Sequence, residues 1–269
     1  MTDFAHFQVI ILAAGCSRRL AHLTADKPKS LLHIGGKSII EHTLNLLECK
    51  GFRRVCFVVG YRRELFMQTL GNRHGSLHID YVISEDFATT EHGWSLYLTA
   101  PVWRRDPAPV LFMDADNLFD PGLLDLALAA PNDNVSLVDD TMNRDDREEE
   151  WVIGANGRVH ALARARYSEL VDVAGGFVGI NRFSRAFMQT LFEFMDSFFD
   201  SHGRTFKYER VIDALLQSGS VTLHYAATEG RPWVNVNHQD DFHNAAEIAQ
   251  LMRANCPPPG DTTAPMISA

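Results

Sequence analysis

Short apolar runs punctuate the first half of the chain. The first of them, "QVIILAA" at 8–14, has no polar residue after its glutamine. Such a run is typical of a strand that is buried on both faces of a sheet. Further strands are predicted at 54–60, 77–84, 109–116 and 134–139.

Segments with helical spacing separate these strands. Ile40, Leu44 and Leu47 fall on one face of a helix, and Ser38 with Glu41 forms a capping box at its start. Further helices are predicted at 62–70, 94–103 and 121–130. Strands and helices that alternate at these lengths predict an α/β fold, with an open, mainly parallel Rossmann-like sheet and helices on both faces.

The second half of the chain has a different pattern. Asn156-Gly157 stands between two short strands, which is a strong hairpin signal and predicts a small antiparallel insertion. We predict one domain at 1–254 and a flexible Pro/Thr-rich tail at 255–269. The remaining predicted strands lie at 150–155, 158–163, 175–183 and 221–227, and the helices at 184–199, 208–217 and 240–254.

Charge and hydropathy limit the class of protein. The net charge is -9, with 34 acidic residues against 25 Lys and Arg, whereas a general nucleic-acid binder usually carries a basic excess. No stretch approaches the roughly 18 apolar residues of a membrane span, and the N-terminus lacks a basic signal-peptide region. We therefore expect a soluble cytoplasmic protein without nucleic-acid or membrane partners. The sequence leaves its oligomeric state open.

Cysteine and histidine give no sign of a metal or disulfide framework. The 4 cysteines form no CxxC pair, and reduced thiols are the default in a cytosolic protein. The 12 histidines show no HExxH or HxH spacing, so structural or surface roles are expected for them.

The loop after the first strand is rich in small and cationic residues. It contains Arg18, Arg19, Lys27 and Lys29, and it leaves the carboxyl end of the strand, where ligands of open α/β sheets bind. Small residues let backbone N–H groups approach an anion, and Arg and Lys neutralise phosphates. Neither GxGxxG nor GxxxxGK[ST] is present, which disfavours a dinucleotide site and a P-loop. The alternative is a solvated basic loop.

Three segments together carry a family resemblance. "LAAGCSRRLAHLTADKPKSLLHIGGKSIIEHTLNLLECKGFRRVCFVVGY" resembles the opening signature of the nucleotidyltransferases, and "LFMDAD" and "PWVNVNHQDDFHNA" continue the likeness over about the first 250 residues. The resemblance implies a nucleotide-diphospho-sugar transferase-like fold. "WSLYLTA" and the short length resemble the branch of phosphocholine and 2-aminoethylphosphonate cytidylyltransferases.

That branch implies a reaction. CMP is transferred from CTP to a small phosphate or phosphonate, of the phosphocholine, 2-aminoethylphosphonate or 2-hydroxyethylphosphonate type, with Mg²⁺ as cofactor and pyrophosphate as leaving group. Arg19 matches the arginine expected on the leaving pyrophosphate, and Lys29 the lysine expected near the α-phosphate and the acceptor. The alternatives are a sugar-1-phosphate nucleotidyltransferase and a catalytically inactive nucleotide-binding regulatory domain. Nucleotide-binding positions implied by the match are Leu12, Ala13, Ala14, Gly15 and Ser17.

The resemblance also implies a metal site. Asp114 matches the family's metal aspartate, with Asp116 as a partner or an alternative ligand, although Asp often only caps a turn. Many relatives have Glu-x-Asp after the late Trp, whereas this chain has "WVNVN", so Asn237 stands at the usual aspartate. An amide oxygen can bind Mg²⁺. A shifted register would instead bring in Asp240 or Asp241.

The acceptor pocket is the least determined part of the site. A quaternary ammonium needs aromatic or acidic surroundings, although buried aromatic residues more often pack a core. Relatives carry Asn-Asn before the Tyr-Ser-Leu helix, where this chain has Glu91 and His92, which points to a different headgroup such as a hydroxyethyl- or carboxyphosphonate. Candidate substrate-binding residues are Glu91, Trp94, Trp151, Phe177 and Glu209.

Two further questions stay open at this level. The charge run "RDDREEE" at 144–150 is predicted to be a solvated loop. If it folds over the site, it favours a cationic acceptor. A second activating cation is common in the family, and the candidates are Arg164, Arg166 and Lys207.

Overall fold

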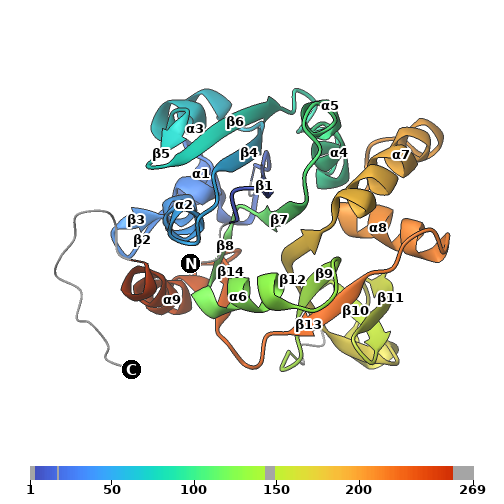
Figure 1. Cartoon of the computed structure of the whole chain (residues 1–269). Helices are drawn as coiled ribbons and strands as arrows, with labels where there is room; N and C mark the ends of the chain where they lie inside the picture. Colours follow the sequence, from blue (N-terminus) through green and yellow to red (C-terminus); the bar gives the residue numbers. More distant parts are fainter. Residues whose placement is uncertain (1–3, 17, 143–148, 257–269) are drawn as a thin grey trace.

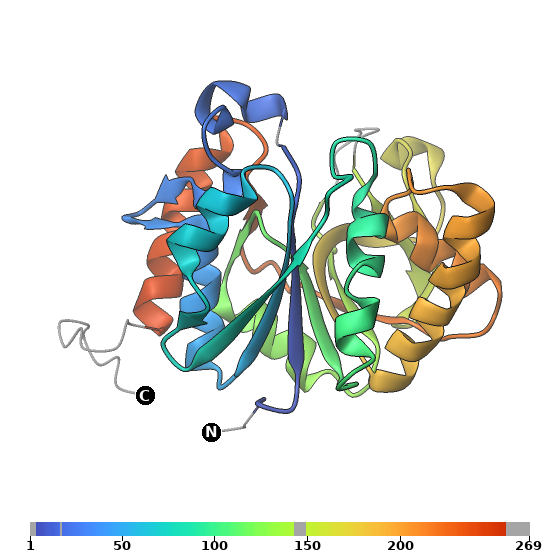
Figure 2. The same ribbon diagram turned by 90° about the horizontal axis from the view of Figure 1, so that it is seen from above.

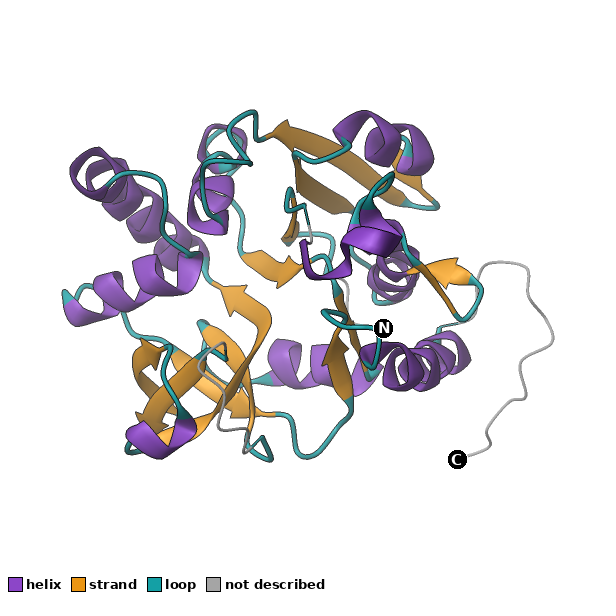
Figure 3. Cartoon of the chain, turned by 180° about the vertical axis from the view of Figure 1, so that it is seen from behind, coloured by secondary structure: helices purple, strands orange, loops and turns teal. Residues whose placement is uncertain are grey.

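The computed structural model describes residues 4–16, 18–142 and 149–256. One mixed ten-stranded sheet runs through the molecule, in the order β10-β11-β13-β9-β12-β7-β1-β4-β6-β5 (Figure 1). Helices cover both of its faces (Figure 2), and the view from behind shows strands running through the middle of the fold (Figure 3). The α/β prediction is confirmed. Most of the predicted tail, at 257–269, lies outside the described residues.

The parallel half of the sheet is built around β1. This strand pairs in parallel with β4 on one side and β7 on the other, and its Leu12 lies opposite Asp114 of β7. The carboxyl ends of β1 and β7 therefore meet at one edge of the sheet. The strands of this half are β1 (Gln8–Ala13), β4 (Arg54–Val59), β6 (Leu77–Ile83), β7 (Val110–Asp114) and the antiparallel edge strand β5 (Arg73–His74).

The remaining strands extend the same sheet mainly by antiparallel pairing, and only β13 and β9 among them pair in parallel. β12 pairs antiparallel with β7, β9 and β10, while β11 continues through β13 back to β9. These strands thus close into a ring. The predicted hairpin is present, and positive φ angles of 52° at Asn156 and 76° at Gly157 fit its tight turn. The strands are β9 (Val135–Asp139), β10 (Trp151–Ala155), β11 (Arg158–Ala163), β12 (Val173–Phe183) and β13 (His224–Ala227).

Two apolar cores lie on opposite faces of the sheet. Val9 and Ile11 of β1 join one core, and Ile10 and Leu12 join the other, which explains why β1 reads as continuously apolar. The first core is covered by α2 (Ile39–Cys49), α3 (Arg63–Leu70), α6 (Pro121–Ala129) and α9 (Asp241–Asn255). The second is covered by α4 (His92–Tyr97), α5 (Ala100–Trp103), α7 (Arg185–His202) and α8 (Tyr208–Gln217).

Short elements surround the carboxyl edge of the sheet. The loop after β1 contains η1 (Arg18–Leu20), α1 (Ala21–Thr24) and η2 (Lys29–Leu31), and then β2 (His33–Ile34) and β3 (Lys37–Ser38). The capping box predicted at the start of α2 is present, with Ser38 and Glu41 bonding reciprocally. A further 3₁₀ turn, η3 (Tyr167–Glu169), follows β11.

A second small sheet, which the sequence did not predict, brings the end of the chain to the centre. β8 (Asn117–Phe119) pairs antiparallel with β14 (Trp233–Asn235), so that Asn235 lies opposite Asn117. Each strand has only three residues, too few for a period of two to be recognised. This pairing places the "WVNVN" segment beside the carboxyl end of β7.

The helix predicted at 94–103 is divided in two. α4 ends at Tyr97 and α5 begins at Ala100. Pro101, in the first turn of α5, has no N–H to continue the hydrogen bonding of the preceding helix. The break therefore follows from the proline.

The prediction of reduced thiols is wrong for two of the cysteines. Cys49, at the end of α2, and Cys256, just after α9, form a disulfide with a Cα–Cα distance of 5.9 Å. The two residues are 207 positions apart, so local spacing carried no sign of the pair. Cys16 and Cys56 are free. Within the described ranges, no helix combines the length and the apolar character that crossing a membrane requires.

Candidate functional site

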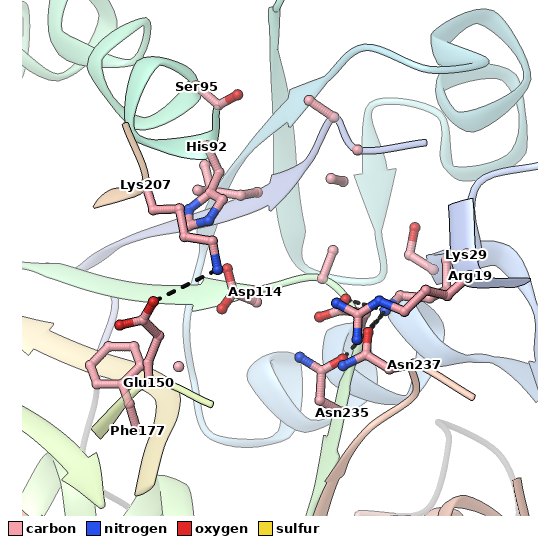
Figure 4. Close-up of a pocket in the computed structure, with 18 of the residues that line it drawn as sticks. Arg19, Lys29, His92, Ser95, Asp114, Glu150, Phe177, Lys207, Asn235 and Asn237 are labelled. Atoms are coloured by element: carbon pink, nitrogen blue, oxygen red, sulfur yellow. Dashed lines mark hydrogen bonds and ion pairs between the residues drawn. The ribbon is translucent and has the colours of Figure 1, made fainter. Parts of the chain in front are cut away.

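A cavity of about 780 Å³ lies at the carboxyl ends of β1 and β7. Its wall is formed by the loop after β1, the end of β7, the turn before α4, the start of α8, and the β14–α9 segment. Figure 4 shows side chains from these separate segments pointing into one space. The position agrees with the expectation from the sheet topology.

Most of the predicted site residues line this cavity. The structure brings together Leu12, Ala13, Ala14, Gly15, Arg19, Lys29, Glu91, Asp114, Phe177, Glu209 and Asn237. Ser17 lies outside the described residues.

Trp94 and Trp151 are not among the lining residues. The ring of Trp94 packs edge-on against Phe199, and the Arg204 guanidinium carbon lies 4.0 Å from its centroid. Trp151 is fully buried, and its Nε1 donates to the carbonyl of Ala165 at 3.1 Å. Both rings stabilise the fold beside the cavity, and the structure does not support their prediction as substrate-binding residues.

Lys29 connects three segments that are distant in sequence. Its ammonium lies 2.5 Å from Asp116 Oδ2, and it donates to Asn237 Oδ1 at 2.9 Å and to Asn235 Oδ1 at 3.3 Å (Figure 4). The side chain is largely buried. A buried ammonium needs such oxygen partners, so the loop after β1, the end of β7 and the β14 segment are held in one arrangement.

Asp114 is a half-buried carboxyl at the end of β7. Burial, followed by repulsion from Asp116, raises its pKa to about 7. The Tyr208 hydroxyl donates to Asp114 Oδ2 at 2.9 Å and offsets only part of that rise. Gly179, at φ 80°, leaves room for this carboxyl, because a Cβ there would lie 2.7 Å from Oδ2. A cation placed beside Asp114 would favour its ionised form.

The oxygen atoms at this end of the cavity suit a hard divalent cation. Asp116 Oδ1 is buried without a hydrogen-bond partner among the described residues. Mg²⁺ usually takes one or two carboxylates and completes its shell with water and phosphate. Across the described ranges there is no cluster of three or more His, Cys, Asp or Glu arranged for a metal. The residues thus fit a magnesium site of few protein ligands.

The structure constrains the second proposed ligand. Asn237 Oδ1 accepts the hydrogen bond from Lys29, so one of its two lone pairs is occupied and a cation there would lie close to the ammonium. The carboxylate of Asp241 accepts from the backbone N–H groups of Asn237 at 2.8 Å and His238 at 2.7 Å. Asp241 therefore fixes the backbone at Asn237.

The other end of the cavity contains charged residues, and some of them were predicted to lie in a solvated loop. Residues 144–150 were predicted to be a solvated loop, but Glu149 and Glu150 line the cavity and Glu150 is buried; 144–148 lie outside the described residues. Lys207 also lines the cavity, with its ammonium 3.8 Å from Glu150 Oε1 (Figure 4). Of the three candidates for a second cation, Lys207 is the one that the structure brings into the lining.

His92 was predicted to be a structural or surface residue, yet it lines the cavity. Burial, followed by the charges of Lys207 and Arg164, lowers its pKa to about 3. The backbone N–H of Tyr208 donates to His92 Nδ1 at 3.5 Å. The imidazole is therefore neutral at physiological pH and its Nδ1 is an acceptor.

Two contacts at the cavity were not anticipated from the sequence. The hydroxyl of Tyr61 donates to the carbonyls of Thr24 at 3.0 Å and Ala25 at 2.7 Å, and its backbone N–H donates to Ala14 O at 3.1 Å. Tyr61 thus holds both ends of the loop that carries Arg19. Across the cavity, Trp233 Nε1 donates to Asp139 Oδ2 at 2.9 Å. The Gly-Tyr dipeptide directly after β4 was the sequence feature that could have indicated the contact of Tyr61 with the loop after β1.

Comparison with known proteins gives partial sequence matches. Over 129 residues the chain is 32% identical to the CMP-5′-(3-aminopropyl)phosphonate synthase of Streptomyces rubellomurinus, which covers 48% of this chain and 20% of that protein. Over 110 residues it is 33% identical to the choline-phosphate cytidylyltransferase of Streptococcus pneumoniae, covering 41% of this chain and 44% of that protein. The matches thus span less than half of these curated relatives.

Sugar-phosphate enzymes match as well. The chain is 36% identical over 74 residues to the UTP–glucose-1-phosphate uridylyltransferase AglF of Haloferax volcanii, covering 28% of this chain and 30% of that protein. The structure resembles the inositol-1-phosphate CTP transferase from T. maritima, with a TM-score of 0.75 over 94% of this chain and 98% of that chain, at 16% identity. At that identity the likeness shows the shared fold.

The family itself is decided by a longer match. The sequence model of the Nucleotidyl transferase family matches residues 8–150, more than half of the chain. The matched range includes the loop after β1 and the end of β7, which carry Lys29 and Asp114. This chain belongs to the nucleotidyl transferase family.

Proposed function

We propose that the protein transfers CMP from CTP to a small phosphate or phosphonate and releases pyrophosphate, with Mg²⁺ as cofactor. The observation that carries the proposal is the lining of one cavity by Arg19, Lys29 and Lys207 together with the carboxyl of Asp114. Two polyanions must meet in this reaction, and cations must hold the charge of the in-line transition state.

The acceptor oxygen attacks the α-phosphorus, the bond to the bridging oxygen breaks, and pyrophosphate leaves with that oxygen. The acceptor is already anionic, so the step needs no general base. Arg19 neutralises the leaving pyrophosphate, and Lys29 binds the α-phosphate after leaving its present oxygen partners. Lys207 faces the acceptor side. The small residues at 12–15 leave space for base and ribose.

Asp114 and Asp116 would hold the magnesium ion. Bound Mg²⁺ neutralises phosphate charge and orients the triphosphate. Asn237 joins this set when Lys29 moves to the phosphate. The Asp114 carboxyl, whose pKa lies near neutrality, ionises more readily with that positive charge beside it.

The choice of CTP and of a small acceptor rests on similarity. The phosphonate synthase and the choline-phosphate enzyme both carry cytidylyl chemistry in their names. The match to a glucose-1-phosphate uridylyltransferase makes a sugar-1-phosphate enzyme the second candidate. An inactive regulatory domain is disfavoured, because Arg19, Lys29 and Asp114 are all present in the cavity.

A substrate panel tests the proposed reaction directly. We expect pyrophosphate release with CTP, Mg²⁺ and at least one of phosphocholine, 2-aminoethylphosphonate or 2-hydroxyethylphosphonate. The matched arms replace CTP by UTP, GTP or ATP, and the acceptor by glucose 1-phosphate. Turnover only with the sugar phosphate would favour the second candidate, and no turnover in any arm would exclude the enzyme.

Replacing Lys29 separates catalysis from loop charge. Lys29→Ala removes a transition-state charge partner, so kcat should fall by roughly 100-fold or more. Lys27→Ala, in the same loop, is the control and should stay within about twofold of wild type, as expected for a solvated charge. Equal loss in the two variants would show that only the general charge of the loop matters.

Replacing Asp114 tests the metal site. Asp114→Asn removes a hard anionic ligand, so the affinity for Mn²⁺, measured by electron paramagnetic resonance in the presence of CTP, should fall at least about tenfold. Asp125→Asn, at an exposed carboxylate that pairs with Lys50, is the matched control. Unchanged Mn²⁺ affinity in the Asp114 variant would assign the metal to other ligands.

Tyr61 tests whether the loop after β1 must be held in place. Tyr61→Phe removes the hydroxyl that binds the Thr24 and Ala25 carbonyls, and the Kd for CTP should rise by roughly two- to tenfold, the value of one hydrogen bond. Tyr81→Phe removes a hydroxyl bond to the Gly71 carbonyl away from the cavity. A similar Kd change in both variants would indicate a general loss of stability.

A further inference from the structure

Acidic residues from separate elements line the cavity, and Figure 4 shows one of them, Glu150, at the end away from Arg19 and Lys29. Glu149 and Glu150 precede β10, and Glu209 lies in the first turn of α8. Glu150 is 9% exposed and Glu209 is 6% exposed. Carboxylates are rarely buried to this degree unless they are paired, so each of these two needs a cation or a hydrogen-bond donor beside it.

One oxygen of each buried carboxylate has no hydrogen-bond donor among the described residues. These oxygens are Glu150 Oε1 and Glu209 Oε2. Glu150 Oε2, in contrast, accepts from Arg210 at 2.8 Å, which fixes the carboxylate in place. Glu150 and Glu209 come from different elements and line the same cavity, and each of the two oxygens lies just beneath its surface.

The neighbouring cations and donors do not satisfy these oxygens. Lys207 Nζ lies 3.8 Å from Glu150 Oε1, beyond a hydrogen bond. His92 Nδ1 lies 3.7 Å from Glu209 Oε2, but it accepts the Tyr208 N–H and so has no proton to donate. A buried acceptor without a donor is unfavourable, and a ligand that brings N–H groups would correct it.

The missing partner has a definite chemistry. A primary ammonium group carries three N–H donors and a positive charge, and it can serve both carboxylates. A trimethylammonium group carries the charge without a donor and is recognised by aromatic faces. A hydroxyl group offers one neutral donor. Of these three headgroups, the primary ammonium alone matches two acidic acceptors in both number and charge.

The phosphate or phosphonate end of such an acceptor would also find a partner in the cavity. Lys207 lies between Glu150 and Asp114 in Figure 4 and faces into the cavity. It therefore offers a cation to a phosphate or phosphonate whose tail reaches toward the acidic residues. An aminoalkyl chain with an anion at one end and a cation at the other follows the distribution of charge in the cavity.

We propose that the acceptor is an aminoalkyl phosphonate or phosphate whose primary ammonium binds Glu209 and Glu150. The inference rests on the proposed CMP transfer and narrows its acceptor. It selects against both the quaternary ammonium and the hydroxyl headgroup. The shared chemistry is a short chain with one phosphonate or phosphate group and one primary amine.

The test compares acceptors of nearly equal size. With CTP and Mg²⁺, kcat/KM for 2-aminoethylphosphonate should exceed that for 2-hydroxyethylphosphonate and for phosphocholine by about tenfold or more, because a site built for N–H donors rejects an analogue without them. Phosphoethanolamine, run beside 2-aminoethylphosphonate, distinguishes a phosphate from a phosphonate. Equal values across headgroups, or preference for phosphocholine or the hydroxyl compound, would overturn the assignment.

Two variants connect the preference to the named residues. Glu209→Gln and Glu150→Gln should each lower the preference for amine over hydroxyl, measured as the ratio of the two kcat/KM values, by about tenfold. Glu247→Gln, exposed on α9, is the control. Uniform loss with every acceptor would contradict the assignment. Melting temperatures identify a variant that fails to fold, and the other then carries the test.

Calorimetry separates this inference from the proposed reaction. Binding of 2-aminoethylphosphonate and of 2-hydroxyethylphosphonate to the whole protein is measured with a non-hydrolysable CTP analogue and Mg²⁺. If no acceptor supports turnover but the amine still binds at least about tenfold more tightly, the headgroup assignment stands while the proposed reaction fails. Equal binding without turnover would reject both.

Discussion

The site depends on the burial of a single ammonium group. Lys29 lies in the loop after β1, and its partners Asp116, Asn235 and Asn237 come from the end of β7 and from the last quarter of the chain. Since a buried charge without partners is strongly unfavourable, these segments must meet for the fold to be stable. The β8–β14 pair supplies the geometry, because it lays "WVNVN" alongside the residues that follow Asp114. One interaction therefore serves both folding and the assembly of the cavity.

Charge varies along the cavity in a way that single residues do not reveal. Arg19 and Lys29 lie at one end, Glu150 lies at the other, and Asp114 lies with Lys207 between them, while Glu209 also lines the cavity. Burial, followed by repulsion from Asp116, raises the pKa of Asp114 to about 7. Burial, followed by repulsion from Asp114 and Glu150, raises the pKa of Glu209 to about 8. The protein groups around Asp114 and Glu209 therefore do not fully stabilise their ionised forms. A cation that enters the cavity would lower the pKa of both carboxyls.

Local sequence patterns predicted the helices, strands and turns better than the contacts between segments that are distant in sequence. The apolar run of β1, the Ser38–Glu41 capping box and the Asn156-Gly157 turn each act within a few residues, and each is present. The Cys49–Cys256 disulfide, the β8–β14 pair and the burial of Glu150 depend on residues far apart in sequence. The same limit explains Trp94 and Trp151. An aromatic residue near a motif is equally compatible with a pocket and with the core behind it, and packing decided for the core.

The amides at Asn235 and Asn237 change how firmly Lys29 is held. The Lys29 ammonium contacts one carboxylate, Asp116, and two neutral amide oxygens, whereas Glu and Asp at these two positions would surround it with three carboxylates. The bonds from Lys29 to the two amide oxygens are charge-assisted as well, but they lack the attraction between opposite charges that a carboxylate adds. A triphosphate, with several charges, therefore competes for Lys29 more easily than it would against three carboxylates. The amides at Asn235 and Asn237 thus hold the Lys29 ammonium in a way that lets an incoming anion displace them more readily.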